Sequence, residues 1–110
     1  MEVICINDKY PAETLDFWTD FGISHPIEDK MYTIRESLRH FDGSIGVRVE
    51  EIVNPTAPIK HPVLGPILYE PTFALNRFAK LNGDLLQKED VEEYLSQVVS
   101  TPKGIDFDMN

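Results

Sequence analysis

Residues 69–81, read as Tyr-Glu-Pro-Thr-Phe-Ala-Leu-Asn-Arg-Phe-Ala-Lys-Leu, decide how the chain closes its fold. Two interpretations of this stretch are open. In the first, residues 72–76 form a helical turn capped by Thr72, and residues 77–81 form a closing strand. In the second, residues 72–81 form one helix, because Ala, Leu, Arg and Lys favour helices and the Asn-Gly pair that follows would end it.

Four side chains of this stretch are expected to serve the structure. Phe73 and Phe78 are the expected core residues. Arg77 and Lys80 are scarce bases in a chain with ten Lys and Arg against nineteen Asp and Glu. We therefore expect both cations to pair within the protein and not to form a binding site. Their expected partners are Glu50, Glu51 and the carboxylates of the acidic C-terminal helix.

Three further segments predict the strands of a sheet. Residues 2–7, Glu-Val-Ile-Cys-Ile-Asn, are a short β-branched run that predicts a strand buried on both faces. Residues 31–40 and 45–53 alternate apolar with polar side chains and predict an antiparallel hairpin. An Asp-Gly pair in the connection suits a four-residue turn. The expected register pairs His40 with Ile45, Leu38 with Val47, and Arg35 with Glu50.

Residues 11–22 predict a helix inserted after the first strand. Pro11 suits its first position, and Gly22 suits a left-handed end. Its aromatic side chains are expected to pack on a sheet, because large exposed apolar patches are uncommon on monomers. The alternative is a partner-binding aromatic patch beside the proline-rich segment. That patch would consist of Phe17, Trp18, Phe21 and Tyr69.

Two segments complete the expected fold. Residues 54–66 contain four prolines, which remove backbone donors that a strand ladder needs, and they predict a long loop. This loop is either functional or a tolerated insertion. A C-terminal helix is expected over residues 88–100, where apolar residues recur with helical spacing and acids crowd the first turns. The apolar stripe is Val91, Tyr94, Leu95, Val98 and Val99, and the acids are Glu89, Asp90, Glu92 and Glu93.

Length and charge limit the classes of protein that this chain can represent. The 110 residues predict one domain over residues 1–104, followed by a frayed tail over residues 105–110. The net charge is −9, of which −5 lies in residues 84–110. Such a surface repels phosphate backbones, so direct nucleic-acid binding is disfavoured. An acidic protein could instead imitate a nucleic acid and inhibit a nucleic-acid-binding protein.

The sequence also indicates a compartment. Its one cysteine, Cys5, excludes an internal disulfide and suits a reducing environment, and its apolar neighbours predict a buried, inert thiol. A secretory signal pattern and an apolar run long enough to span a bilayer are both absent from the sequence. We therefore expect a cytoplasmic protein without a membrane partner.

No motif for catalysis, cofactor binding or metal binding appears in the sequence. His25, His40 and His61 are scattered, and none has a second ligand three or four positions away, so no metal site is expected. His25 and His61 each precede a proline, which suggests exposed loop positions. We expect no cofactor, no catalytic residue and no enzymatic activity. A small enzyme whose site is invisible in the sequence is the less favoured option.

A likeness to known proteins emerges from four short patches taken in order. They are residues 1–8, the Tyr-Thr-Ile of 32–34, the Val-Glu-Glu-Ile of 49–52, and Phe73 followed by Arg-Phe-Ala-Lys-Leu at 77–81. Together they resemble a group of small uncharacterised proteins carried by phages and mobile elements. Those proteins look like compact SH3-like β-barrels, in which a helical turn precedes a last short strand with an Arg-Phe pair.

This resemblance gives an expected fold class and role. The fold would be mainly β with helices (α+β), a small antiparallel SH3-like barrel carrying the helices near residues 11–22 and 88–100. The resemblance implies a phage or mobile-element origin and a binding role, and it carries no catalytic residue. We therefore expect a non-catalytic protein-binding module that acts by occupying the surface of a protein partner.

Overall fold

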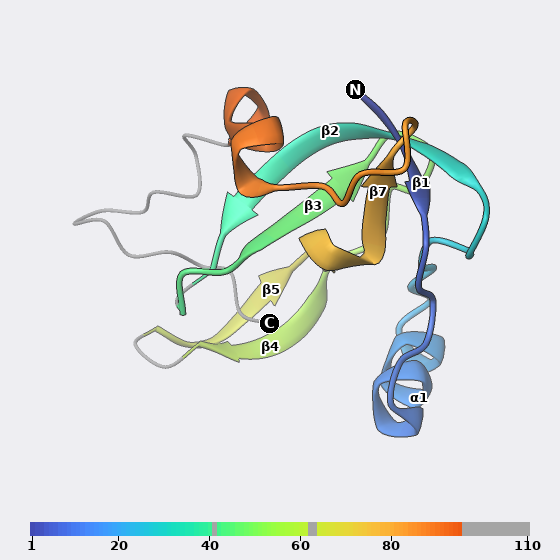
Figure 1. Ribbon diagram of the computed structural model, residues 1–110. Helices are drawn as coiled ribbons and strands as arrows, with labels where there is room; N and C mark the ends of the chain where they lie inside the picture. The colour runs from blue at the N-terminus through green and yellow to red at the C-terminus, as the bar shows by residue number, and fades with distance from the viewer. Residues whose placement is uncertain (41, 62–63, 96–110) are drawn as a thin grey trace.

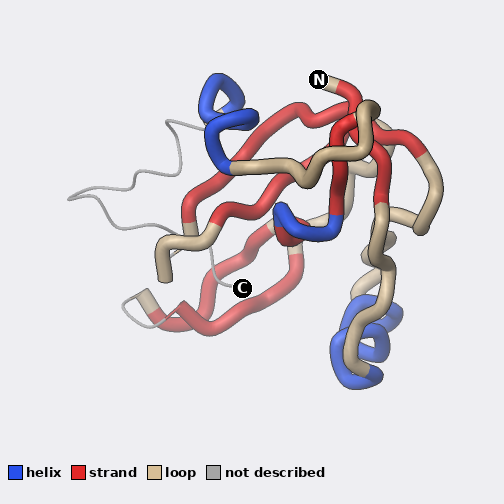
Figure 2. Tube along the Cα trace, viewed as in Figure 1, coloured by secondary structure: helices blue, strands red, loops and turns tan. Residues whose placement is uncertain are grey.

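The computed structural model describes residues 1–40, 42–61 and 64–95 (Figures 1 and 2). Its elements are β1 (Glu2–Cys5), α1 (Ala12–Asp20), β2 (Met31–Arg39), β3 (Ile45–Val49), β4 (Ala57–His61), β5 (Gly65–Tyr69), β6 (Phe73–Ala74), η1 (Leu75–Arg77), β7 (Phe78–Lys80) and η2 (Lys88–Tyr94), where η marks a 3-10 helix. The fold is α+β and mainly antiparallel β, as predicted. Among these residues no helix is long and apolar enough to cross a bilayer.

A five-stranded antiparallel sheet in the order β6-β3-β2-β1-β7 forms the body of the molecule. Its two edge strands, β6 and β7, follow one another in the chain and are joined by η1. The sheet therefore bends strongly, so that both of its edges reach the same short turn (Figure 1). Within the part of the chain that the structure describes, no sheet closes into a barrel through hydrogen bonds.

The closing stretch forms a strand, a turn and a second strand. The turn-plus-strand prediction is therefore confirmed, and the alternative of one helix is wrong. Phe73 pairs with Val47 of β3, and Phe78 pairs with Cys5 of β1. Both phenylalanines are core residues, as predicted. In a helix, side chains five positions apart point about 140° away from one another, so both rings could not enter one core.

The β2–β3 hairpin forms as predicted but one residue out of the predicted register. The observed pairs are Ser37 with Val47, Leu38 with Gly46, and Arg39 with Ile45. The turn causes the difference, because the His40 N–H donates to the Ser44 carbonyl over 2.7 Å and residue 40 therefore faces residue 44 and not Ile45. A β-bulge between Ile34 and Glu36 then shifts the register again and reverses which alternate side chains of β2 face the core. Leu38 consequently leaves the main core and packs with Tyr69 and Ile59.

Strand β1 covers the core with one face. Val3 and Cys5 are buried, whereas Glu2 is exposed, so the prediction of burial on both faces is wrong. This alternation is the ordinary pattern of an antiparallel strand that has one solvated side. Cys5 is buried, as predicted, and that burial raises the pKa of its thiol.

Strands β4 and β5 form a hairpin where the sequence predicted a loop, so that prediction is wrong. The prolines are compatible with pairing because of their spacing. Pro58 faces Leu68, and Pro66 faces Lys60, two residues further along the ladder. Antiparallel pairs alternate between hydrogen-bonded and non-hydrogen-bonded, and a proline can occupy only the second kind without losing a bond. The hydrogen bonds therefore fall on the other pairs, which are Ala57–Tyr69, Ile59–Ile67 and His61–Gly65.

The C-terminal part of the described chain is a short 3-10 helix, η2, and not the predicted α-helix. Val91 enters the main core, and its carbonyl oxygen accepts a hydrogen bond of 2.8 Å from the Ser37 hydroxyl. Leu95 then makes a bridge with Ser37, so the chain has already left the helix there. The remainder of the predicted helix, with Val98 and Val99, lies outside the described residues, as do the domain boundary at 104 and the predicted tail over 105–110.

Acid is expected to weaken the start of η2. Asp90 accepts a hydrogen bond of 2.8 Å from the Gln87 N–H and one of 3.3 Å from Lys80 Nζ. The Gln87 bond, supported by Lys80, holds the pKa of Asp90 below its usual value near 3.8. A lowered pKa in the folded state contributes stability that is present above pH 3.8 and is lost as the pH falls through the folded value.

We therefore predict that urea unfolding requires less urea as the pH falls below about 4. Asp90→Asn should show a shallower loss over that range, and Asp20→Asn, on the exposed side of α1, serves as the control. Equal pH dependence in Asp90→Asn and the unmodified protein would show that this hydrogen bond does not stabilise the fold.

Candidate functional site

Helix α1 exposes apolar side chains to solvent. None of its residues, all of which the structure describes, is buried. Phe17 is 36% exposed, and Phe21, directly after the helix, is 40% exposed. The prediction that these rings pack in the core is therefore wrong. Figure 1 shows the physical reason: α1 projects from the end of the β1 segment and does not lie on the face of the sheet.

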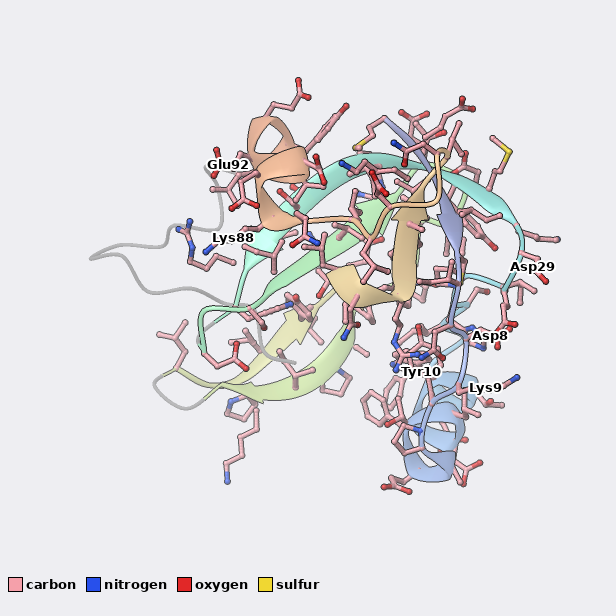
Figure 3. The ribbon with its side chains drawn as sticks, viewed as in Figure 1. Asp8, Lys9, Tyr10, Asp29, Lys88 and Glu92 are labelled. Atoms are coloured by element: carbon pink, nitrogen blue, oxygen red, sulfur yellow. The ribbon has the colours of Figure 1, made fainter. Side chains whose placement is uncertain are left out.

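Trp18 attaches α1 to the body of the protein. Its ring lies 5.7 Å from Phe73 of the core and 4.7 Å from Tyr10, both in edge-on contact, measured between ring centroids. His25 stacks beside the same rings and is half-buried, so its predicted exposure is wrong. Tyr10 lies beside α1 (Figure 3), and burial raises the pKa of its hydroxyl to about 12.

A groove separates α1 from the β4–β5 hairpin. It has a volume of about 190 Å³ and is lined by Thr14, Phe17, Trp18, Ala57, Ile59, Tyr69, Pro71 and Thr72. Three of the four predicted partner-binding residues thus meet in one place: Phe17, Trp18 and Tyr69. The fourth, Phe21, is outside the lining, but its ring lies 4.8 Å from that of Phe17 and extends the aromatic surface.

The polar groups at the floor of this groove bond to one another. The Tyr69 hydroxyl donates to Thr72 Oγ1 over 3.3 Å, and the same oxygen lies 3.0 Å from His40 Nε2. The side chain of Thr72 is therefore occupied by these hydrogen bonds. It does not cap η1, so the predicted Thr72 cap is wrong. An occupant of the groove would accordingly meet an apolar surface.

A polar link holds the two walls of the groove together. The Asn54 side-chain amide exchanges two hydrogen bonds of 2.8 Å with the backbone of Ser24, which follows α1. The Asn54 N–H donates to Glu70 Oε2 over 3.0 Å at the end of the hairpin. Glu70 also binds the guanidinium groups of Arg35 and Arg48, so the predicted pairing of Arg35 with Glu50 is wrong. The role of Asn54 could not be predicted, because a single amide in a proline-rich segment has no recognisable motif.

An acidic row borders the aromatic surface. Glu13, Asp16 and Asp20 are exposed and recur at helical spacing along α1. Residues three and four positions apart are neighbours on a helix, so Glu13 and Asp20 both lie next to Phe17. The helix contains no Lys or Arg. A segment that covers Phe17 would therefore experience a local negative potential.

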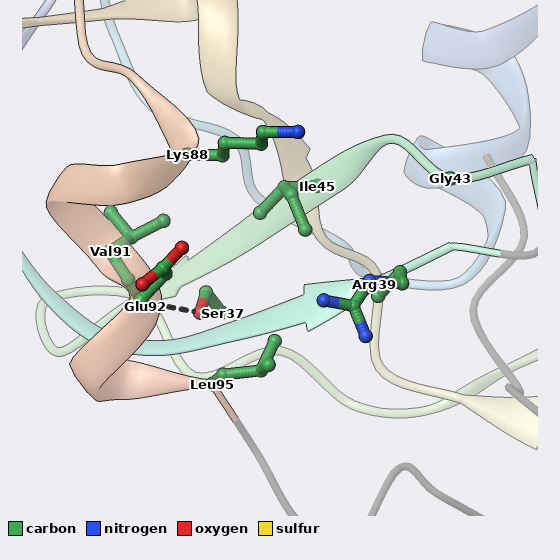
Figure 4. A pocket seen from close by; sticks show the side chains of 8 residues that line it. All are labelled: Ser37, Arg39, Gly43, Ile45, Lys88, Val91, Glu92 and Leu95. Atoms are coloured by element: carbon green, nitrogen blue, oxygen red, sulfur yellow. Dashed lines mark hydrogen bonds between the residues drawn. The ribbon is translucent and has the colours of Figure 1, made fainter. Parts of the chain in front are cut away.

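Another pocket, of about 110 Å³, lies between η2 and the β2–β3 hairpin (Figure 4). Its charged lining residues are Arg39, Lys88 and Glu92, and its Ser37 hydroxyl already donates to the backbone of η2. None of the predicted partner-binding residues lines it. Among the described residues, no group of histidine, cysteine and acidic side chains could hold a metal ion.

Comparison with protein-family models, curated proteins and solved structures gives no match to this chain. The predicted resemblance to phage and mobile-element proteins therefore stays a prediction. The case for a function depends on the geometry of the groove.

Arg77 fixes the segment that leads into α1. Its guanidinium carbon lies 3.7 Å from the centroid of the Tyr10 ring, and its Nη1 donates to the Lys9 carbonyl over 2.7 Å. Arg77 thus binds inside the protein, as predicted, but to an aromatic ring and carbonyls and not to an acid. The same prediction is confirmed for Lys80, which pairs with Asp90.

We predict that Arg77→Ala loosens α1. Loss of the cation–π contact and the carbonyl hydrogen bond should cost about 1–2 kcal/mol of unfolding free energy. The fluorescence of Trp18, the single tryptophan, should shift to longer wavelength as its ring becomes more exposed. Arg39→Ala, on the exposed side of β2, is the control. An unchanged emission spectrum in Arg77→Ala would show that Arg77 does not hold α1.

Proposed function

We propose that this protein is a non-catalytic protein-binding module that docks a segment of a partner protein between α1 and the β4–β5 hairpin. One observation carries the proposal: α1 is apolar on the side of the groove, yet none of its residues, all described, is buried. Contiguous exposed apolar surface on a soluble protein commonly marks an interaction site. Aromatic side chains such as Phe17 and Trp18 are typical anchors of such sites.

Charge complementarity indicates the chemistry of the partner. The acidic row of Glu13, Asp16 and Asp20 flanks the groove, so the segment should combine apolar side chains with Lys or Arg. A second copy of this chain is a poor occupant. It would bring the same acidic row and its own net charge of −9 to the interface.

The alternative, an acidic protein that imitates a nucleic acid, has less support. It needs the carboxylates of η2 to face a partner together. Glu89, Glu92 and Glu93 are exposed, but Asp90 is occupied by Gln87 and Lys80. A binding role also agrees with the predicted SH3-like character of the fold, which the strand order β6-β3-β2-β1-β7 and the 3-10 turn before β7 support. We retain that fold assignment and the phage or mobile-element origin as proposals.

A displayed library of random peptides tests the binding function. The immobilised protein should enrich peptides that contain both large apolar residues and Lys or Arg. Affinity measured by fluorescence anisotropy should fall at least tenfold for Phe17→Ser/Phe21→Ser, a loss of about 1.4 kcal/mol. Because both rings are exposed, this variant should fold normally, which circular dichroism can verify.

Leu68→Ser/Leu81→Ser is the matched control, since both leucines are exposed apolar residues outside the lining of the groove. Its affinity should equal that of the unmodified protein. The proposal fails if no basic, apolar peptide is enriched, or if both double variants bind equally well.

A further inference from the structure

We infer that the partner presents an α-helix to the groove, and not an extended strand, and that one large apolar side chain of that helix enters it. This inference rests on the proposed function and specifies how the partner is recognised. It draws on three observations: the backbone of the hairpin edges, the polar groups of the groove, and the length of the acidic row.

The edges of the β4–β5 hairpin are unsuited to adding a strand. Because the hydrogen bonds of this hairpin fall on the pairs without proline, residues 58 and 60 of β4 and residues 66 and 68 of β5 direct their backbone groups outward. Pro58 and Pro66 have no N–H, so only Lys60 and Leu68 offer an outward donor. Strand addition depends on a continuous row of main-chain donors and acceptors. Prolines on edge strands are a common protection against such pairing.

The edges of the main sheet offer no better template in the described chain. Strand β6 has two residues, and strand β7 has three. Ala79, in the middle of β7, already bridges to Leu85 on the side away from β1. An extended segment of another protein could therefore pair with only a very short strand at either edge of the main sheet.

The interior of the groove favours a segment that satisfies its own backbone. The hydroxyl groups of Tyr69 and Thr72 bond to one another at its floor. An extended peptide laid into this groove would bury N–H and C=O groups without partners, at a cost of about 1–3 kcal/mol for each. A helix makes its backbone hydrogen bonds internally and can present side chains alone.

The dimensions agree with a helix anchored at one point. The groove volume of about 190 Å³ equals that of about six water molecules, which suits one large apolar side chain and not a row of them. The acidic row extends from Glu13 to Asp20, a distance of about 10 Å along the axis of α1. Two turns of a partner helix cover the same distance, so basic residues seven positions apart could reach both ends of the row.

Two peptide libraries of matched basic and apolar composition test this inference. One is displayed on a helix-constrained scaffold, and the other on a disulfide-closed, strand-forming scaffold. The helical library should give enrichment that depends on Phe17 and Phe21, and the enriched helices should carry one dominant apolar position. Pro58→Val/Pro66→Val restores the outward N–H groups, so it should gain strand-library binding or self-association while its affinity for the helices stays within twofold.

The outcomes separate the inference from the proposed function. If the unmodified protein prefers strand peptides, and their binding protects the Lys60 and Leu68 amides from hydrogen exchange, the helical mode is wrong while the binding function stands. If neither library gives binding that the Phe17→Ser/Phe21→Ser variant loses, the binding function itself is wrong. If helices are preferred and the proline variant gains no strand binding or self-association, the edge argument is overturned.

Discussion

Replacing Phe78 by alanine is expected to lower the unfolding free energy by about 3–5 kcal/mol, the largest effect that we predict for this chain. The ring is fully buried in the main core. Phe78 is also the first residue of the edge strand β7, and it pairs with Cys5 of β1. Truncation would remove the burial of the ring and leave a cavity that the bent sheet cannot collapse without separating β7 from β1.

Urea unfolding followed by circular dichroism measures this loss. Phe21→Ala is the matched control, because Phe21 is 40% exposed and its truncation should change the unfolding free energy by no more than about 0.5 kcal/mol. A loss below about 1 kcal/mol in Phe78→Ala would mean that this residue does not close the fold.

Gly46→Ala is expected to cost about 2–3 kcal/mol, the second largest effect. Gly46 is buried in β3 beneath the floor of the groove. A Cβ atom at this position would collide with Thr72 Oγ1 and His40 Nε2, the two atoms that share a hydrogen bond of 3.0 Å. The substitution should therefore strain β3 and break the hydrogen-bond chain that engages the polar groups of the groove.

A double-mutant cycle separates this collision from a general effect on the strand. Thr72→Ala removes the hydroxyl oxygen that the new methyl group would meet. If the collision is the cause, Gly46→Ala should cost less in the Thr72→Ala background than alone, by more than about 0.5 kcal/mol. Additive losses would show that the Thr72 hydroxyl is not part of the collision and would contradict its place in this crowded site.

The sequence left the closing stretch open between a turn followed by a strand and one helix, because its Ala, Leu, Arg and Lys residues favour a helix locally. The outcome depends on Phe73 and Phe78 both reaching one core, which the strand, turn and second strand allow and one helix would not. The pairing of two hairpins was also misjudged. In the β2–β3 hairpin the turn pairs His40 with Ser44, one residue away from the predicted partner, and a bulge near Arg35 is a further local distortion that strict alternation cannot reveal.

The prolines of the β4–β5 hairpin were misjudged for a different reason. The number of prolines argued against strands, whereas the position of each proline in the ladder decides whether the strands can pair. Pro58 and Pro66 occupy pairs of the same kind across the ladder, where no N–H is required. This compatibility depends on knowing which residues face one another, and a single sequence does not contain that information.

The candidate groove could be predicted only in part. Phe17, Trp18, Phe21 and Tyr69 were given as a partner-binding patch only as the alternative to core packing, because they are large and apolar near a proline-rich segment. Whether a helix with such residues is buried or exposed depends on its position relative to the sheet. Contacts remote in sequence, such as Asn54 with Ser24 and Arg77 with Tyr10, decide that position.

The central claim is that a partner segment docks between α1 and the β4–β5 hairpin. Its most direct test is an NMR titration of the ¹⁵N-labelled protein with an enriched basic, apolar peptide. We predict that the single indole N–H, from Trp18, and the amides of Thr14, Phe17, Ile59 and Tyr69 shift most. The largest shifts at Glu89, Glu92 and Glu93 of η2, with the Trp18 indole unchanged, would contradict the claim.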